Sequence, residues 1–487
     1  MKLEVLKKFV HNSELYGDGN VDITGLEYDS RRIKPGMLFF AVSGFKQNGN
    51  KFINDAISNG AAAVVTENNA ELNVPYIVVP SVRRAMADIA AGFYGQPGES
   101  MIFIGVTGTN GKSTSVYLVK EILSASGKKA GAINSLVYDT GSNKYKAERT
   151  TPEAVDLQKY FHEMRDAGCT HAVVEVSSHA LVLNRVENIN FQVGLYTNFS
   201  RDHLDFHKTM EDYLKAKRLL LDKLDSTDQY VVINADVKEY ATFVNDIHCN
   251  LITYSVKYKM ADVHITDISM YPDRSEFSLV TPAGSGNITV RLPGRYNLSN
   301  VTGAAAAGVA LGIDIETIIR GLENAAPVPG RFQPLDASQP FSIIIDYAHT
   351  PDAIERLCES AREITKGKLK ILFGCGGDRD SGKRALMGEA ASTNADFVVL
   401  TSDNPRTEDP LKIIEDVKPG LKNNNYEIIP DRREAIEYLL NQAEEGDMLL
   451  FAGKGAENYQ EIGTTRYPFE DGKEILRVLE AKGYKKG

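Results

Sequence analysis

The sequence predicts an α/β protein of three domains, and three observations support this fold class. The chain has 487 residues, more than a single hydrophobic core usually accommodates. Short apolar runs alternate with helix-like stretches along most of its length. Two joints rich in proline and glycine, "YGQPGES" (94–100) and "APVPGR" (326–331), interrupt this alternation. We therefore predict domains at residues 1–98, 99–329 and 330–487.

The sequence predicts a small sheet in the first segment and a larger, mostly parallel sheet in the second. The N-terminal segment is expected to form a small α/β domain with strands at 36–44, 61–67 and 75–80. The central segment opens with the apolar run 101–107 and alternates strands with helices, which favours a mostly parallel sheet. Residues 262–292 instead alternate polar and apolar side chains around the turn "TPAGSGN", so an antiparallel excursion is expected there.

The C-terminal segment repeats one unit, an apolar run followed by a helix-like stretch. This pattern predicts a doubly wound, Rossmann-like α/β domain, in which ligands bind beyond the carboxyl ends of the strands. The expected strands are residues 342–346, 368–374, 395–401, 426–430 and 447–453.

Composition and charge exclude several classes of protein. A net charge of −10 argues against non-specific nucleic-acid binding. The four cysteines have no metal-type spacing, which favours buried thiols in a reducing compartment. The N-terminus is too charged for a signal peptide, and no apolar run approaches the roughly 18 residues of a membrane span. We expect a cytoplasmic monomer, not inserted in a membrane, whose partners are small molecules.

The segment "VTGTNGKST" (106–114) follows a predicted strand and precedes a predicted helix, as a phosphate-binding loop does. Its glycines let backbone N–H groups surround phosphate oxygens, and the helix N-terminus adds partial positive charge. Val106 stands where the general motif has its first glycine, and a plain glycine turn before a helix is the alternative. We predict a P-loop ATPase domain whose ATP-binding residues include Gly108, Thr109, Asn110, Gly111, Lys112, Ser113 and Thr114.

Polar residues after the loop supply candidate metal ligands. Glu175 lies in an apolar run, and burying its carboxylate without a partner is costly. A Mg²⁺ held jointly with Ser113 would meet that need, and a salt bridge is the alternative. The segment "YTNFSRDHLDFH" (196–207) gathers several acids and histidines, each of which alone is more typical of a cap or surface group. Residues 210–224 look like an amphipathic helix with a solvated lysine face.

Seven motifs in order resemble the Mur ligases of peptidoglycan synthesis, an ATP-dependent pathway of cell-wall biogenesis. They cover nearly the whole chain: "TGTNGKST", "EVSSHAL", "TNFSRDHLDFH", "LPGRYNLSNVTGAAAA", "PGRFQ", "DYAHTPDA" and "GDRDSGKR". The resemblance implies an N-terminal domain for the UDP end of the substrate, a central ATPase domain and a C-terminal domain for the incoming amino acid.

The resemblance also implies the roles of individual residues. Lys112, Arg331 and His203 would be catalytic, and Ser113, Glu175, His203 and Lys217 would hold Mg²⁺, Lys217 as an N6-carboxylysine (a carbamate). Further ATP contacts would be Asn297, Arg331, Asp346 and His349. The nucleotide-sugar peptide UDP-MurNAc-L-Ala-D-Glu would meet Ser30, Thr150, Thr151, Ser177 and Arg185. Two positions depart from some members, Leu183 in place of Gln and Arg149 in place of Asn.

Three loops follow strands of the C-terminal segment and would open on one edge of a parallel sheet. They are "GCGGDRD" (374–380), "SDNPRTED" (402–409) and "GKGAEN" (453–458). Their two arginines, together with acids such as Asp403 and Glu457, suit a zwitterion with a surplus carboxylate, such as meso-diaminopimelate. In the family, D-N-P-R resembles the signature of the diaminopimelate-adding members. The implied binding residues are Arg379, Asp403, Asn404, Pro405, Arg406, Gly453 and Glu457.

These residues predict a ligase that uses ATP and Mg²⁺ to add meso-diaminopimelate to the D-Glu carboxylate through an acyl phosphate. The alternatives are a lysine-adding member, another Mur-type or folylpolyglutamate-type ligase, and a P-loop ATPase coupled to movement or partner binding. For Arg406, the alternative is a helix cap or a salt bridge to Glu408 or Asp409.

Overall fold

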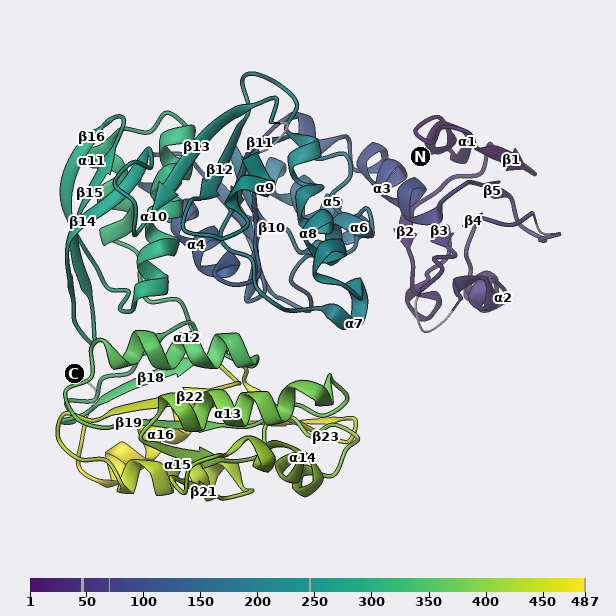
Figure 1. The fold of residues 1–487 in the computed structure, drawn as a ribbon. Helices are drawn as coiled ribbons and strands as arrows, with labels where there is room; N and C mark the ends of the chain where they lie inside the picture. The colour runs from purple at the N-terminus through teal and green to yellow at the C-terminus, as the bar shows by residue number, and fades with distance from the viewer. Residues whose placement is uncertain (45–47, 70, 245–246, 486–487) are drawn as a thin grey trace.

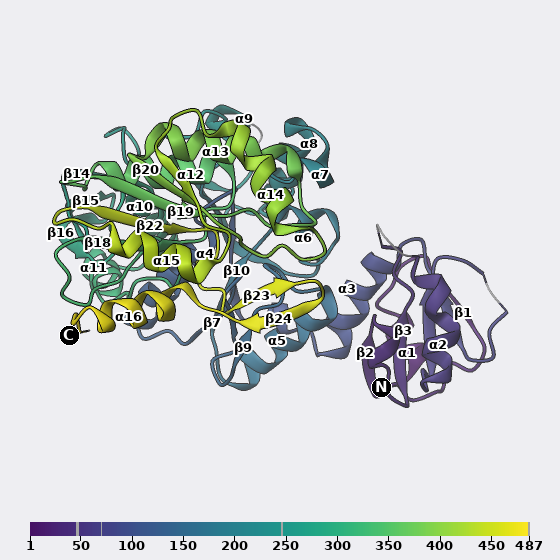
Figure 2. The same cartoon turned by 90° about the horizontal axis from the view of Figure 1, so that it is seen from below.

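The computed structural model describes residues 1–44, 48–69, 71–244 and 247–485. Within these residues, three large sheets succeed one another along the chain, and a short two-stranded hairpin lies near the C-terminus. Figure 1 shows the N-terminal domain at one end of the central domain, with the C-terminal domain against another side. The view in Figure 2 shows the N-terminal domain projecting away from the other two. The predicted three-domain α/β fold is confirmed.

The N-terminal domain has a five-stranded sheet of order β1-β5-β4-β3-β2, in which only β1 runs antiparallel to its neighbour. The three predicted strands are present and shorter than expected. Its elements are α1 (Leu3–Lys7), β1 (Glu14–Tyr16), β2 (Gly25–Glu27), β3 (Met37–Phe40), α2 (Ile53–Ser58), β4 (Ala63–Thr66), β5 (Tyr76–Val78) and α3 (Val82–Phe93).

The central domain has an eleven-stranded mixed sheet of order β16-β15-β14-β13-β12-β11-β6-β10-β7-β8-β9. Its middle is parallel, and β14 to β16 form the predicted antiparallel excursion. The strands are β6 (Ile102–Thr107), β7 (Ala130–Ile133), β8 (Val137–Asp139), β9 (Lys144–Lys146), β10 (His171–Glu175), β11 (Phe191–Tyr196), β12 (Tyr230–Asn234), β13 (Asn250–Ser255), β14 (Val263–Met270), β15 (Ser275–Thr281) and β16 (Gly284–Val290). The helices are α4 (Lys112–Ala125), α5 (Ala154–Asp166), α6 (Ser178–Val182), α7 (Leu204–His207), α8 (Met210–Arg218), α9 (Tyr240–Val244), α10 (Arg295–Ala310) and α11 (Ile315–Glu323).

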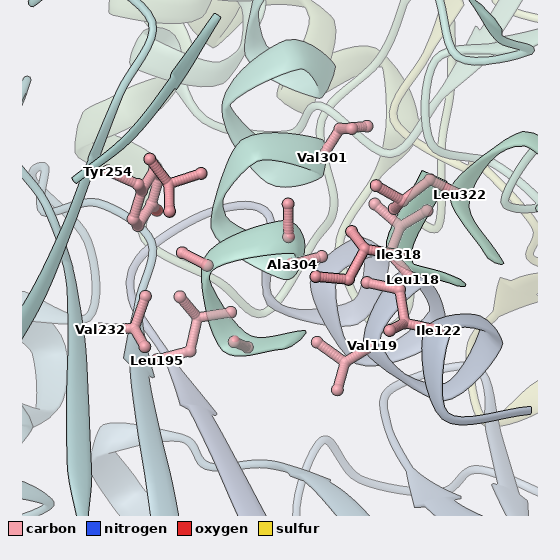
Figure 3. Packing of buried hydrophobic residues seen from close by; sticks show 14 of the residues in the cluster. Leu118, Val119, Ile122, Leu195, Val232, Tyr254, Val301, Ala304, Ile318 and Leu322 are labelled. Atoms are coloured by element: carbon pink, nitrogen blue, oxygen red, sulfur yellow. The ribbon is translucent and has the colours of Figure 1, made fainter. Parts of the chain in front are cut away.

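Helix α4, which follows the predicted phosphate loop, is held in a large apolar core with α10 and α11 (Figure 3). Leu118, Val119 and Ile122 of α4 are fully buried in it. A Cβ atom on Gly321 of α11 would lie 2.7 Å from the Ile122 Cα, so glycine permits the close approach of the two helices. This packing gives the phosphate loop a rigid base.

The C-terminal domain has a six-stranded sheet of order β17-β18-β22-β19-β20-β21, in which all strands but β17 run parallel. Alternate residues of its strands enter two separate apolar clusters, with α12 to α14 on one face and α15 and α16 on the other. The doubly wound prediction is therefore confirmed. The elements are β17 (Gln333–Pro334), β18 (Ser342–Asp346), α12 (Pro351–Arg362), β19 (Leu369–Phe373), α13 (Arg384–Asn394), β20 (Phe397–Leu400), α14 (Pro410–Val417), β21 (Tyr426–Ile428), α15 (Arg432–Asn441), β22 (Met448–Ala452), β23 (Tyr459–Ile462), β24 (Thr465–Pro468) and α16 (Asp471–Ala481).

Some sequence-based expectations are refined. The predicted helix 210–224 ends at Arg218, and a 3₁₀ turn follows at Leu221–Lys223. All four cysteines are free thiols and three are buried, as expected. Across the described ranges, no helix combines the length and apolar character that a membrane crossing requires. The domain limits 98/99 and 329/330 fall outside the three large sheets and stay predictions.

Candidate active site

The phosphate loop lies between β6 and α4 and takes a backbone conformation that requires glycine. Gly108 and Gly111 have positive φ angles of 144° and 81°. A Cβ on Gly108 would lie 1.9 Å from Thr197 Oγ1. Asn198, after β11, braces the loop: its side-chain Oδ1 accepts from the Asn110 N–H at 2.8 Å. The two glycines and Asn198 thus hold the loop in a defined conformation.

Lys112, Ser113 and Glu175 come together at the start of α4. Ser113 Oγ donates to Glu175 Oε2 at 2.7 Å, and the Ser135 N–H donates to the same oxygen at 3.0 Å. Lys112 Nζ lies 3.9 Å from Glu175 Oε1 and donates to the Thr109 carbonyl at 2.8 Å. Glu175 therefore forms an ion pair with Lys112, as in the salt-bridge alternative, and also accepts closer hydrogen bonds from Ser113 and Ser135. Sequence reasoning missed Ser135, which follows β7 without any motif of its own.

Arg331 reaches this cluster from the start of the C-terminal domain. Its Nη2 donates to Ser135 Oγ at 3.3 Å, and its guanidinium carbon lies 4.7 Å from the ring centre of Tyr347. Asp346, at the end of β18, accepts from the Phe332 N–H at 2.6 Å and so holds the turn after Arg331. Burial raises the pKa of Asp346, while Arg331 lowers it. A cation of the third domain is thereby brought to the phosphate loop.

Lys217 is 1% exposed, and its Nζ donates to the Gly108 carbonyl at 2.7 Å. The interpretation of the α8 lysines as a solvated face is therefore wrong for this residue. Burial, followed by the charge of Lys112, lowers its pKa well below the usual value. His203 lies near this region, with Nε2 3.4 Å from Asp202 Oδ2. Among the described residues, no three His, Cys, Asp or Glu side chains form a metal-binding group.

Two further predicted ATP contacts have local partners. Asn297 is buried in the first turn of α10, donates to the Pro293 carbonyl at 2.9 Å and accepts from Asn300 at 3.3 Å. His349 is exposed after β18, and its Nδ1 lies 2.9 Å from the Tyr347 carbonyl oxygen. Their roles toward a nucleotide remain predictions.

Three of the residues predicted for the sugar-peptide substrate lie together beside Glu175. Thr151 Oγ1 donates to the Glu175 carbonyl at 2.7 Å and lies 3.2 Å from Ser177 Oγ. Arg185 Nη1 donates to the Thr151 carbonyl at 3.0 Å. Thr150 is adjacent and half-buried. Ser30 is buried in the separate N-terminal domain, in the 3₁₀ turn Ser30–Arg32.

Glu153 was missed by the sequence reasoning and is contacted by three arginines. Arg185 Nη2 donates to Glu153 Oε1 at 2.7 Å and Arg149 Nη1 donates to it at 3.1 Å. Arg83, from α3 of the N-terminal domain, lies 3.5 Å from Glu153 Oε2. Arg149, one of the two departures, thus has a structural partner. Leu183, the other, is the C-cap residue of α6.

The three C-terminal loops do meet on one edge of the sheet. Asn404 Nδ2 donates to Glu457 Oε2 at 2.8 Å, which joins the loops after β20 and β22. Asp403 is buried, and its Oδ2 has no hydrogen-bond partner among the described residues. A Cβ on Gly453 would lie 2.8 Å from that oxygen, so glycine keeps the space beside it open. Pro405 is buried next to Asn404.

Arg406 lies in the left-handed region, with φ 51°, and its backbone is bound by the β23–β24 hairpin. Its Nη1 donates to the Gly377 carbonyl at 2.8 Å, and its Nε lies 3.4 Å from Glu461 Oε2. The alternative partners are excluded: Glu408 pairs with Arg384 at 2.9 Å, and Asp409 caps α14 through the Leu411 N–H. Arg379 is exposed in the neighbouring loop. Both arginine side chains approach Gly376.

Direct contacts connect the central and C-terminal domains at the site. Asn110 Nδ2 lies 3.4 Å from Asp352 Oδ2 of α12. Lys146 Nζ of β9 donates to Asn458 Oδ1 at 2.8 Å, next to Glu457. Figure 2 shows the β23–β24 hairpin passing close to β9. The phosphate loop and the polar edge of the C-terminal sheet therefore belong to one interdomain region.

Comparison with known proteins gives matches in all three parts of the chain. Residues 22–94 match the Mur ligase family catalytic domain, residues 106–308 the Mur ligase middle domain, and residues 330–455 the Mur ligase glutamate ligase domain. The UDP-N-acetylmuramoyl-L-alanyl-D-glutamate--2,6-diaminopimelate ligase of Geobacillus thermodenitrificans is 43% identical over 478 residues, which are 97% of this chain and 98% of that protein. The enzyme of that name from Bacillus velezensis is 41% identical over 98% and 99% of the two chains.

Solved structures agree with these matches. A structure of a UDP-N-acetylmuramoyl-L-alanyl-D-glutamate--2,6-diaminopimelate ligase is 32% identical, covers 100% of both chains and superposes with a TM-score of 0.70. MurF from Acinetobacter baumannii, at 18% identity, shares the fold with a TM-score of 0.69 and covers 99% and 98% of the two chains. The chain therefore belongs to the Mur ligase family.

Proposed function

We propose that this protein is an ATP-dependent ligase that adds meso-diaminopimelate to the D-Glu carboxylate of UDP-MurNAc-L-Ala-D-Glu, a step of peptidoglycan precursor synthesis. The relatives above carry the name of a 2,6-diaminopimelate ligase and match nearly the full chain. The proposal depends on the polar edge of the C-terminal sheet, which contains Asn404, Arg406 and Glu457. This edge faces the central domain, which contains the phosphate loop. A cytoplasmic monomer is part of the proposal.

ATP would bind with its phosphates in the loop 108–114, where backbone N–H groups and the start of α4 favour anions. Ser113 Oγ and Glu175 Oε2 lie 2.7 Å apart and are the hard oxygen donors that Mg²⁺ prefers, so the residues fit this ion. His203 and a carbamate on Lys217 would serve a second ion. Lys217 is buried with no carboxylate ion-pair partner among the described residues, as suits a lysine that becomes a ligand. Bound Mg²⁺ would supply charge neutralisation at the phosphates.

The residues of this chain would activate a carboxylate by positioning and charge. Lys112 and Arg331 would face the γ-phosphoryl group as it passes to the substrate carboxylate, which becomes an acyl phosphate. The amine of the incoming amino acid would then attack the acyl carbon, the C–O bond to phosphate would break with its electron pair leaving on the phosphate, and the released phosphate would take the extra proton from the nitrogen. No side-chain nucleophile is required, and placement of the reactants supplies most of the rate. The contacts between the central and C-terminal domains would close the site around them.

The two substrates would enter from opposite sides of this centre. The sugar-peptide would be held by Ser30, Thr150, Thr151, Ser177 and Arg185. Of these, Arg185 lies beside Thr151, where it would face the carboxylate of the peptide. Asp403 and Glu457 would receive an ammonium group of diaminopimelate. Arg406 and Arg379 would receive its distal carboxylate, because a guanidinium pairs with a carboxylate through two parallel hydrogen bonds. Lysine has no such carboxylate, which separates this proposal from a lysine-adding ligase.

Phosphate release from ATP tests the proposal. With UDP-MurNAc-L-Ala-D-Glu present, release should require meso-diaminopimelate and stay near background with lysine, glutamate or no amino acid. Release that depends on lysine would contradict the substrate assignment. Release that needs no amino acid would favour a P-loop ATPase coupled to a partner and would contradict the ligase proposal itself.

A further inference from the structure

Lys454 lies in the loop after β22, between two glycines, and none of the roles above uses it. Its side chain is fully buried, at 0% exposure. Its Nζ donates to Asn404 Oδ1 at 3.0 Å and lies 3.5 Å from Glu457 Oε2. Burying an ammonium group is costly unless it is paired and hydrogen-bonded. The burial of this ammonium group is therefore explained by its contacts with Asn404 and Glu457.

The first consequence of this contact is a fixed orientation of the Asn404 amide. A lysine ammonium can only donate hydrogen bonds, so it can pair with the amide oxygen and not with the amide nitrogen. The Glu461 N–H also donates to the same Oδ1, at 2.9 Å. The amide nitrogen must then point the other way, where it donates to Glu457 Oε2. Asn404, at 2% exposure, cannot flip without losing these bonds.

The second consequence concerns Glu457, whose two carboxylate oxygens have different surroundings. Oε2 accepts from Asn404 and Lys454, whereas Oε1 receives no hydrogen bond from any described residue. Burial raises the pKa of Glu457, Lys454 lowers it and Asp403 raises it. The nearby Asp403 Oδ2 is buried and also has no hydrogen-bond partner among the described residues. Two carboxylate oxygens from two loops are thus left for a cation.

We infer that Lys454 is a positioning residue for the incoming amino acid. Its ammonium fixes the Asn404 amide and holds Glu457 as an oriented carboxylate, whose Oε1 receives, together with Asp403 Oδ2, the ammonium group of diaminopimelate that does not attack the acyl carbon. Lys454 itself does not touch the substrate. The inference rests on the proposed function, since it assigns a role within the amino-acid site.

Substitution of Lys454 by methionine, with a matched control, tests this role. Lys370 in β19 is also a buried lysine of this domain, paired with Asp447 at 2.6 Å at the other end of the sheet. Lys370→Met should therefore cost stability without affecting the amino-acid site. Lys454→Met should raise KM for diaminopimelate roughly 10- to 100-fold, as expected when charge-assisted hydrogen bonds are lost. The kcat and the KM for ATP should change less than about 3-fold in both variants.

The pH dependence separates positioning from a merely structural effect. The groups that influence Glu457 are Lys454, Asp403, Arg432, Tyr347 and Tyr459. Removing Lys454 removes the cation that lowers the pKa of Glu457, so Glu457 becomes protonated at a higher pH. On acidification, KM for diaminopimelate should therefore begin to rise at a higher pH in Lys454→Met than in the wild type. In Lys370→Met the profile should follow the wild type.

A double variant completes the test. If Lys454 acts through Glu457, adding Lys454→Met to Glu457→Gln should raise KM for diaminopimelate little beyond Glu457→Gln alone. Additive effects, or a Lys454→Met enzyme with wild-type KM and pH profile, would overturn the inference while the proposed function stands. A wild type that shows no diaminopimelate-dependent phosphate release would overturn both. Should Lys454→Met not fold, Lys454→Gln, which keeps an N–H donor but no charge, takes its place with the same expectations.

Discussion

Replacing Lys112 by methionine is expected to lower kcat for phosphate release by roughly 10²- to 10³-fold, the usual effect of removing one preorganised donor from a site of developing charge. The ammonium group lies 3.9 Å from Glu175 at the start of α4, where it would face the γ-phosphoryl group. KM for diaminopimelate should change less than about 3-fold, because that site lies in another domain. Initial rates at saturating substrates provide the measurement.

Lys120→Met is the matched control for this variant. Lys120 lies on the same helix, and its Nζ pairs with Asp139 at 2.5 Å. It should keep kcat close to that of the wild type. Equal losses in the two variants would mean that Lys112 supports the helix and does not act on phosphate. A large increase in KM for diaminopimelate in Lys112→Met would contradict the division of the site between two domains.

Replacing Arg406 by alanine is expected to reduce kcat/KM for meso-diaminopimelate by roughly 10²- to 10³-fold or more, because a buried charge pair that loses one partner costs about 3–5 kcal/mol. Activity with lysine should change far less, since lysine lacks the distal carboxylate. The ratio of kcat/KM for the two amino acids should therefore fall. Arg406→Lys should recover only part of the loss, because an ammonium cannot form the bidentate pair.

The hairpin that carries the Arg406 backbone also provides its control. Arg466, on β24, is largely exposed and lies 3.9 Å from Glu461, the residue that pairs with Arg406. Arg466→Ala should leave both kcat/KM values within about 3-fold of the wild type, as is usual for exposed ion pairs. If Arg406→Ala weakened use of ATP as strongly as use of diaminopimelate, Arg406 would have a structural role.

Much of the fold could be predicted from local patterns. The apolar runs of the C-terminal domain could be predicted as parallel strands because turn residues bound them and segments with helical periodicity separate them. The structure pairs them in parallel. The phosphate loop was recognisable since its glycines, lysine and serine are contiguous. The edge that gathers Asn404, Arg406 and Glu457 followed from strand direction alone, because carboxyl ends of parallel strands meet.

What could not be predicted depends on contacts between distant segments. Helix α8 has two lysines, Lys215 and Lys217. The family resemblance singled out Lys217 as a metal ligand, but only the packing against Gly108 shows that it is buried. Ser135 and Glu153 carry no motif, and their importance appears when arginines from other elements reach them. Lys454 sits in a glycine loop where its burial has no local signal. The short hairpin that binds the Arg406 backbone is likewise a long-range feature.

A competition between two amino acids tests whether meso-diaminopimelate is the amino acid that this ligase adds. The protein is incubated with ATP, Mg²⁺, UDP-MurNAc-L-Ala-D-Glu and equal concentrations of meso-diaminopimelate and lysine, and the nucleotide-linked products are identified by mass spectrometry. The product should carry diaminopimelate almost alone, with lysine incorporated at most about 1% as often, because a bound lysine would leave Arg406 unpaired. Equal incorporation of the two amino acids, or a product that carries mainly lysine, would contradict it.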